Sequence, residues 1–276
     1  LTFSGVETIL AELSEKLYKN AFQTNENNDL SKAEILDHLY EIREILQTKH
    51  DGLFIHLVNE LICKVETFGL HFASLDIRQD SSIHRNILEE IAEKTDLLTK
   101  NYVLLSDSEK IEKLLQINSS VDSEIFDDEI AKDTIENIAA VKQIQAINGE
   151  KGCERYIISH CESALNVIEV FALFLLGSWR KEELTIDIIP LFETVDDLKN
   201  ASQIMRELYE NETYREHLSR RNDLQTIMLG FSDGTKDGGY LMANWSIYKA
   251  KDELTRISRD FGIEVIFFDG RGGPPA

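Results

Sequence analysis

The stretch Thr185–Glu193, which reads TIDIIPLFE, decides the fold class of this 276-residue chain. It is rich in β-branched and aromatic residues, has the length of a strand, shows little polar alternation and ends on a carboxylate. A strand of this kind is expected to be buried on both faces, as in a parallel sheet covered by helices. The charged residue that follows it then lies at the edge of the sheet where α/β enzymes place their active sites.

Four further stretches have the same form, and each ends in a polar cluster. They are residues 73–77, 155–158, 226–231 and 264–268. Helical patterns lie between them, so the chain consists of βα repeats and a parallel sheet is predicted. Because five strands are too few to close an eight-stranded barrel, we expect a helix-rich α/β fold that forms a partial (β/α)8 TIM-type barrel with large helical insertions.

Helix formers dominate the rest of the chain, and no proline occurs before Pro190. The clearest helical signals are capping boxes at Ser31 and Ser106, a pattern over 53–68 that Gly69 ends, and a pattern over about 123–147. We predict two parts from this distribution. They are a helical segment at 1–70 that leads into the barrel, and the partial barrel at 71–276 with a helical insertion at about 82–150.

Composition excludes several classes of protein. The net charge of −21 argues against nonspecific nucleic-acid binding, although a few focused arginines would still suffice for an anionic substrate. The longest apolar run, Val170–Leu176, is too short to span a membrane. The three cysteines are widely spaced without a CxxC pair, as is typical of reduced thiols in the cytoplasm.

Glu193 and Asp233 form a candidate metal-binding pair. Each comes directly after or close behind a strand, and they lie 40 residues, or one βα unit, apart in the sequence. Neighbouring strand ends bring two carboxylates close enough to share a hard divalent ion, with waters completing its coordination. The alternative is that each residue caps the helix that follows it, and Thr194 with Asp196 and Asp197 is itself a good helix start.

Three cationic side chains are candidates for binding an anion. Lys236 lies in the glycine-rich turn Ser232–Gly239, whose backbone amides could also face an anion, although an ordinary βα turn is the alternative. Arg78 and Arg271 each lie at the mouth of a strand, and a guanidinium binds phosphate or carboxylate with two hydrogen bonds. Arg78 could instead pair with a neighbouring acid, whereas Arg271 has glycines on both sides that let a ligand approach.

These segments resemble the phosphoenolpyruvate carboxylase family at several points in the correct order, over about residues 60–276. The similar segments are Leu75–Asp80, Pro190–Leu198, Gly230–Gly238 and Phe268–Gly273, with Trp245 and Tyr248–Ala250 on the helix between the last two. The resemblance is weaker through the acidic insertion near 100–150. One of these motifs alone is weak, whereas four in order are specific.

The resemblance implies a lyase that fixes carbon dioxide in the cytoplasm, as a homotetramer with no membrane or nucleic-acid partner. Phosphoenolpyruvate and bicarbonate would give oxaloacetate and phosphate with Mg²⁺ or Mn²⁺, through carboxyphosphate and an enolate. The matching positions imply metal ligands at Glu193 and Asp233 and catalytic roles for Arg78, Arg271 and Lys236. Substrate would be bound by the two arginines and by the two glycines that follow the second of them, Gly272 and Gly273.

Two departures limit the resemblance. Asp269 stands where the family has a histidine, and the chain ends at Ala276, within the family's glycine-rich arginine loop. We therefore expect an internal fragment that has no carboxylase activity alone. The alternatives are a noncatalytic helical interaction module and another metal-dependent barrel enzyme acting on phosphoenolpyruvate or pyruvate.

Overall fold

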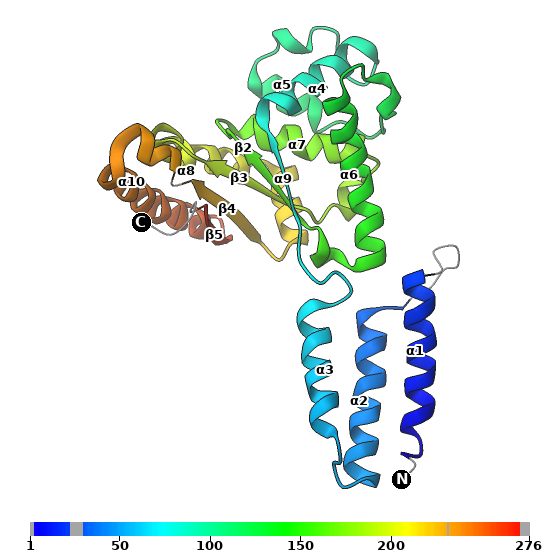
Figure 1. Ribbon diagram of the computed structural model, residues 1–276. Helices are drawn as coiled ribbons and strands as arrows, with labels where there is room; N and C mark the ends of the chain where they lie inside the picture. The colour runs from blue at the N-terminus through cyan, green and yellow to red at the C-terminus, as the bar shows by residue number, and fades with distance from the viewer. Residues whose placement is uncertain (1–2, 23–29, 231, 271–276) are drawn as a thin grey trace. The chain divides into compact units, whose positions relative to one another are not determined.

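The computed structural model describes residues 3–22, 30–230 and 232–270, with the backbone alone at 232–235, 237 and 238. The chain divides into two compact units (Figure 1). The first contains the residues up to Ser74 together with Ile144–Gly152, and the second contains Leu75–Gln143 and the residues from Cys153 onward. None of the helices in the described ranges combines the length and apolar character that a membrane span requires.

The first unit is built mainly from helices α1 (Val6–Phe22), α2 (Lys32–Lys49) and α3 (Ile55–Phe68). Apolar residues at helical spacing form its core, including Leu39 and Ile42, which are almost completely buried. The predicted capping residue is confirmed, because the Ser31 side chain accepts a hydrogen bond from the backbone N–H of Glu34.

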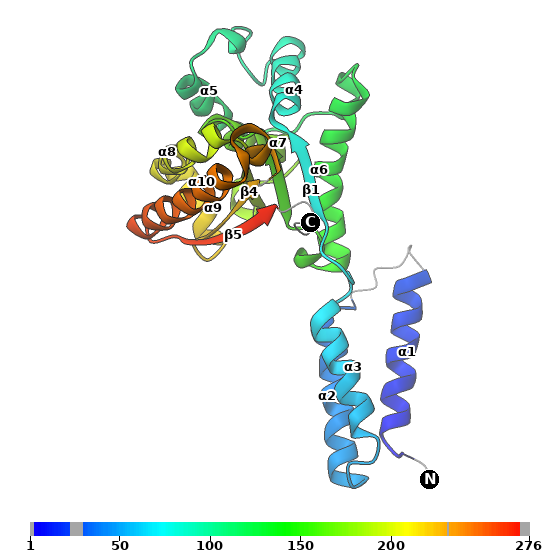
Figure 2. The same cartoon turned by 60° about the vertical axis from the view of Figure 1, so that its left-hand side comes forward.

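The second unit contains a five-stranded parallel sheet in the order β1-β2-β3-β4-β5, which confirms the predicted βα repeats and fold class. Figure 2 shows β1 and β5 at the two edges of this open sheet. Because all strands are parallel, their carboxyl ends meet at one edge. The strands are β1 (Asp76–Asp80), β2 (Arg155–Ser159), β3 (Asp187–Phe192), β4 (Leu224–Gly230) and β5 (Glu264–Gly270).

Two details of the predicted strands were wrong. The first strand lies three residues later than predicted, so Arg78 belongs to β1 itself rather than to the polar cluster after it. Burial on both faces holds for β3, where every residue is buried, but not for β1 and β5. These two are edge strands with a sheet neighbour on one side only, so their side chains are covered less.

Helices join the strands and cover the sheet. Helix α7 is buried along its whole length and contacts α4, α5 and β3, while α8 packs along α10. Helix α6 begins at Glu129, later than the predicted 123, because a short 3₁₀ turn occupies Ser123–Ile125. The helices are α4 (Ser81–Lys94), α5 (Asp107–Leu114), α6 (Glu129–Asn148), α7 (Ala164–Leu176), α8 (Val195–Glu210), α9 (Glu212–Arg220) and α10 (Ser232–Asp260).

One carboxyl group lies inside the apolar helix α7. Glu169 is completely buried, and one of its oxygens accepts a hydrogen bond from the Asn166 side-chain amide at 3.1 Å. Its other oxygen has no hydrogen-bond partner among the described atoms. Burial raises the pKa of Glu169 to about 7, although Asn166, Arg85 and Lys110 oppose the change. This carboxyl therefore holds a proton in the folded chain at a pH where it is ionised in water.

A second buried carboxylate is paired. Asp187, at the start of β3, contacts the Arg221 guanidinium at 3.0 Å and accepts a 2.5 Å hydrogen bond from the Thr226 hydroxyl of β4. Both members of the ion pair are nearly inaccessible to solvent. Burial raises the pKa of Asp187, and Arg221 opposes this rise. The pair joins the strands at the edge of the sheet opposite their carboxyl ends.

Candidate functional site at the carboxyl ends of the strands

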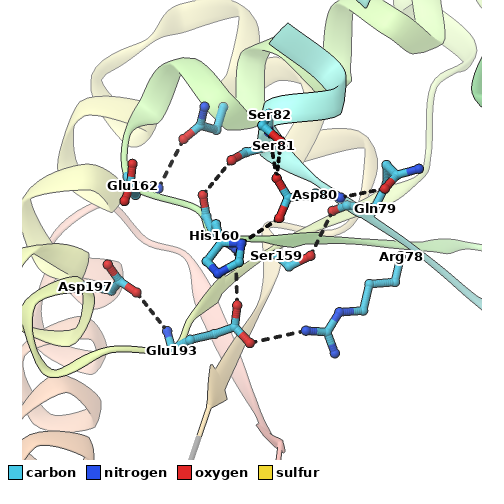
Figure 3. A network of polar contacts seen from close by, with 11 residues as sticks. Arg78, Gln79, Asp80, Ser81, Ser82, Ser159, His160, Glu162, Glu193 and Asp197 are labelled. Carbon is cyan, nitrogen blue, oxygen red and sulfur yellow. Dashed lines mark hydrogen bonds and ion pairs between the residues drawn. The ribbon is translucent and has the colours of Figure 1, made fainter. Parts of the chain in front are cut away.

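Polar side chains from three adjacent strands meet at the carboxyl edge of the sheet (Figure 3). The register explains why, since Asp80 at the end of β1 lies beside Ser159 at the end of β2. Glu193 follows Phe192, the last residue of β3. Near this end of β3, Leu191 pairs with Met228 of β4. Parallel pairing thus brings together residues that are more than 100 positions apart in the sequence.

Glu193 is at the centre of this edge. Its Oε1 contacts the Nη2 of Arg78 at 3.2 Å, and its Oε2 accepts a hydrogen bond from the backbone N–H of His160 at 3.3 Å (Figure 3). The Glu193 side chain is only 12% exposed, whereas that of Arg78 is 48% exposed. The guanidinium therefore faces solvent, while the carboxylate is held against the sheet edge.

The capping alternative for Glu193 is wrong. Helix α8 is capped by Thr194, whose hydroxyl accepts a hydrogen bond from the backbone N–H of Asp197. The Asp197 carboxylate in turn accepts hydrogen bonds from the backbone N–H groups of Glu193 and Thr194. This reciprocal capping box satisfies the first turn of the helix and leaves the Glu193 side chain free to contact the strand ends.

The end of β4 lies directly against Glu193. A Cβ atom on Gly230 would be 3.0 Å from the Cα of Glu193 and 3.2 Å from its Cγ. Such contacts are tighter than those of most real Cβ atoms, so a glycine suits this position best. Gly230, the last residue of β4, therefore lies beside Glu193.

The acids near Arg78 in the sequence have other partners. Asp76 contacts Arg155 at 2.8 Å, and Asp80 contacts the Nδ1 of His160 at 2.5 Å. The alternative prediction, that Arg78 pairs with one of these neighbouring acids, is therefore wrong. Arg78 instead reaches across β2 to the carboxylate after β3, which connects two predicted site residues directly.

Asp80 and His160 belong to the same network, and the sequence prediction did not include them as site residues. Partial burial raises the pKa of Asp80, but hydrogen bonds from Ser82 and His160 outweigh it and lower that pKa to about 2. The contact with Asp80 raises the pKa of His160. Cys161, the next residue, is completely buried, whereas His160 is exposed. The signal for this pair was the position of both residues at strand ends.

The remaining predicted residues fall into two groups. Lys236 is exposed within α10, which is interrupted by Gly239 at a φ of +77°. Asp269, predicted to replace a histidine, contacts Lys251 of α10 at 2.6 Å. The side chain of Asp233 lies outside the described part of the chain. So do the predicted loop residues Arg271, Gly272 and Gly273.

The donor atoms at this edge suit a hard divalent cation. Among the described residues no group of three or more histidine, cysteine, aspartate or glutamate side chains is arranged to hold a metal. A Mg²⁺ or Mn²⁺ ion needs fewer protein ligands, since one or two carboxylates with waters complete its octahedron. Glu193 offers a carboxylate whose lone pairs exceed its two hydrogen-bond partners. The side chain of the other expected ligand, Asp233, lies outside the described part of the chain. The Glu193 carboxylate by itself fits one ligand position of such an ion.

Comparisons with known proteins agree with these motifs. The family model described as phosphoenolpyruvate carboxylase matches residues 6–274. The phosphoenolpyruvate carboxylase of Nitrosomonas europaea is 37% identical over 240 residues, which is 84% of this chain and 26% of that protein. Those of Nitrosomonas eutropha and a Synechococcus species are 34% and 36% identical over 98% and 82% of this chain, and over 30% and 22% of their own lengths. The chain thus spans about a quarter of these relatives, and it belongs to the phosphoenolpyruvate carboxylase family.

Proposed function

We propose that the chain forms part of a phosphoenolpyruvate carboxylase, which converts phosphoenolpyruvate and bicarbonate to oxaloacetate and phosphate. The observation that carries this proposal is the contact between Arg78 of β1 and Glu193 after β3. It joins a phosphate-binding type of side chain to a metal-binding type of side chain at the active-site edge of a parallel sheet. The membership of the family supplies the reaction.

The carboxylates have the role of holding the metal. Glu193 and Asp233 would bind Mg²⁺ or Mn²⁺, and the ion when bound would neutralise negative charge on the substrate. The backbone N–H of His160 keeps the Glu193 carboxylate at the strand ends. The low exposure of Glu193 limits competition from water for its oxygens.

The cationic residues have the role of holding the phosphoryl group. Arg78 presents a half-exposed guanidinium beside Glu193, and Arg271 and Lys236 would add further positive charge. Glycines on the loop, Gly272 and Gly273, would let the substrate approach the backbone. In phosphoryl transfer such groups act by position and charge, so they need no covalent step of their own.

The same proposal extends to the location, oligomeric state and reaction class of the whole protein. The whole protein would be a cytoplasmic homotetramer and a lyase that fixes carbon dioxide. This chain has a formal charge of −21, so most of its surface repels an anionic substrate. The few arginines at the strand ends would attract such a substrate locally.

Oxaloacetate formation tests the proposal. We expect the whole protein that carries this chain to form oxaloacetate only with phosphoenolpyruvate, bicarbonate and Mg²⁺ or Mn²⁺ together, in an assay coupled to malate dehydrogenase. Arg78→Lys should lower kcat/KM by at least about tenfold, because an ammonium cannot replace the two-pronged guanidinium. Lys199→Gln, on the exposed face of α8, is the matched control and should leave the rate unchanged. Turnover that does not require bicarbonate would refute the carboxylase assignment.

A further inference from the structure

His160 adopts a backbone conformation that its residue type seldom takes. Its φ is +51°, in the left-handed region that glycine occupies freely and other residues occupy rarely. The residue comes directly after β2, at the carboxyl edge of the sheet. A non-glycine residue persists in this conformation when surrounding contacts hold it there.

Two contacts from the start of α4 hold His160 in place. The Asp80 carboxylate contacts the imidazole Nδ1 at 2.5 Å, and the Ser81 hydroxyl donates a 2.7 Å hydrogen bond to the His160 carbonyl oxygen. Asp80 is itself fixed, because its other carboxylate oxygen accepts hydrogen bonds from the backbone N–H and hydroxyl of Ser82. Side chain and backbone of His160 are therefore anchored to the same short segment.

The anchored backbone of His160 points its N–H group toward the Glu193 carboxylate. In this conformation the N–H of His160 faces the Oε2 of Glu193 at 3.3 Å, while Arg78 contacts Oε1 on the other side (Figure 3). Both oxygens of the carboxylate thus have a partner, one from β1 and one from the end of β2. A carboxylate restrained at both oxygens presents its remaining lone pairs in a fixed direction.

We propose that Asp80 and His160 are positioning residues that aim the Glu193 carboxylate, with Asp80 holding His160 in its left-handed conformation. This inference deepens the proposed function, because it takes Glu193 to be a ligand of the divalent ion. It assigns the backbone N–H rather than the imidazole as the group that acts on Glu193. Residues that orient a metal ligand typically change metal affinity by about 10- to 100-fold when they are replaced.

Substitutions at position 160 separate backbone from side chain. His160→Gly keeps the N–H and adopts positive φ freely, so Mn²⁺ affinity measured by electron paramagnetic resonance should stay within about threefold of the native value. His160→Val places a β-branched residue at positive φ, which turns the N–H away, and Mn²⁺ affinity should fall about tenfold or more. Ser178→Val is the matched control, since Ser178 has a φ of +72° beyond the end of α7, and its affinity should equal the native value.

A substitution at position 80 tests the anchor without disturbing the helix. Asp80→Ser retains a good N-cap for α4 but is too short to reach the imidazole, so Mn²⁺ affinity should again fall about tenfold. Hydrogen exchange of the His160 amide gives a readout that needs no metal. Exchange should be about tenfold faster or more in Glu193→Ala, Asp80→Ser and His160→Val than in the native chain.

The outcomes are distinguishable from a failure of the proposed function. A native chain that binds no Mn²⁺ refutes the metal site, and the exchange rates then decide whether His160 holds Glu193. Unchanged exchange in Glu193→Ala would overturn the positioning contact. Native Mn²⁺ affinity in both His160→Val and Asp80→Ser would overturn the inference even if the metal binds.

Discussion

We predict that Glu169→Gln changes the pH dependence of the folding stability of this chain. Glu169 is buried within α7 with one unpartnered oxygen, and its pKa rises from 4.5 to about 7 on folding. Between these two values the folded chain keeps a proton that the unfolded chain has lost. The free energy of unfolding must therefore fall as the pH rises from about 4.5 to about 7.

The size of the effect follows from the change in pKa. A difference of one pKa unit corresponds to about 1.4 kcal/mol, so the full change corresponds to on the order of 3 kcal/mol. Glutamine has nearly the same shape, can still accept the Asn166 hydrogen bond and never ionises. The unfolding free energy of Glu169→Gln minus that of the native chain should thus increase by on the order of 3 kcal/mol between pH 4.5 and pH 8.

Urea unfolding followed by circular dichroism at a series of pH values measures this difference. Other groups, such as His84, titrate in the same range. Burial lowers the pKa of His84 to about 4. This shift makes the native stability rise between about pH 4 and 6.5. Such contributions are common to both proteins and cancel in the difference. Glu182→Gln, at an exposed carboxyl, is the control. A difference between Glu169→Gln and the native chain that stays constant across this range would show that Glu169 does not keep a proton in the folded chain.

Three further predictions concern the sheet and its edge. Thr194→Ala removes the hydroxyl that caps α8 and should lower the unfolding free energy by about 1 kcal/mol in urea denaturation; an unchanged midpoint would contradict the capping role. Gly230→Ala places a Cβ 3.0 Å from the Glu193 backbone, and should cost about 1–3 kcal/mol and weaken Mn²⁺ binding; native affinity would contradict the close approach. Arg221→Leu leaves the buried Asp187 carboxylate without its cation and should cost about 3–5 kcal/mol, whereas a loss under 1 kcal/mol would show that the pair contributes little.

The sequence predicted five strands in βα repeats because hydrophobic runs that end in polar clusters are local signals. Every residue of β3, which ends at Phe192, is buried, as expected from the composition of the predicted strand. The position of β1 was missed by three residues, since the polar residues Arg78 and Asp80 do not look like a strand. They form one because pairing with β2 satisfies their backbone, and sequence periodicity does not record pairing.

The site was predicted in part for the same reason. Glu193 and Arg78 were recognised singly, from strand ends and from the family resemblance, but their contact depends on the register across three strands. Asp80 and His160 are 80 positions apart, and His160 adopts a left-handed backbone conformation in this contact. No local sequence pattern predicts either feature. Contacts between distant strand ends are the part of a site that a single sequence leaves open.

Titration with Mn²⁺ tests whether the carboxyl edge of this sheet carries a metal site. Electron paramagnetic resonance of the native chain should show one bound Mn²⁺, and Glu193→Gln and Asp233→Asn should each weaken that binding by at least about tenfold. Asp196→Asn, at an exposed carboxylate on the adjacent helix, should bind as the native chain does. A folded native chain that binds no Mn²⁺, or a Glu193→Gln variant with native affinity, would show that Glu193 is not part of a metal site.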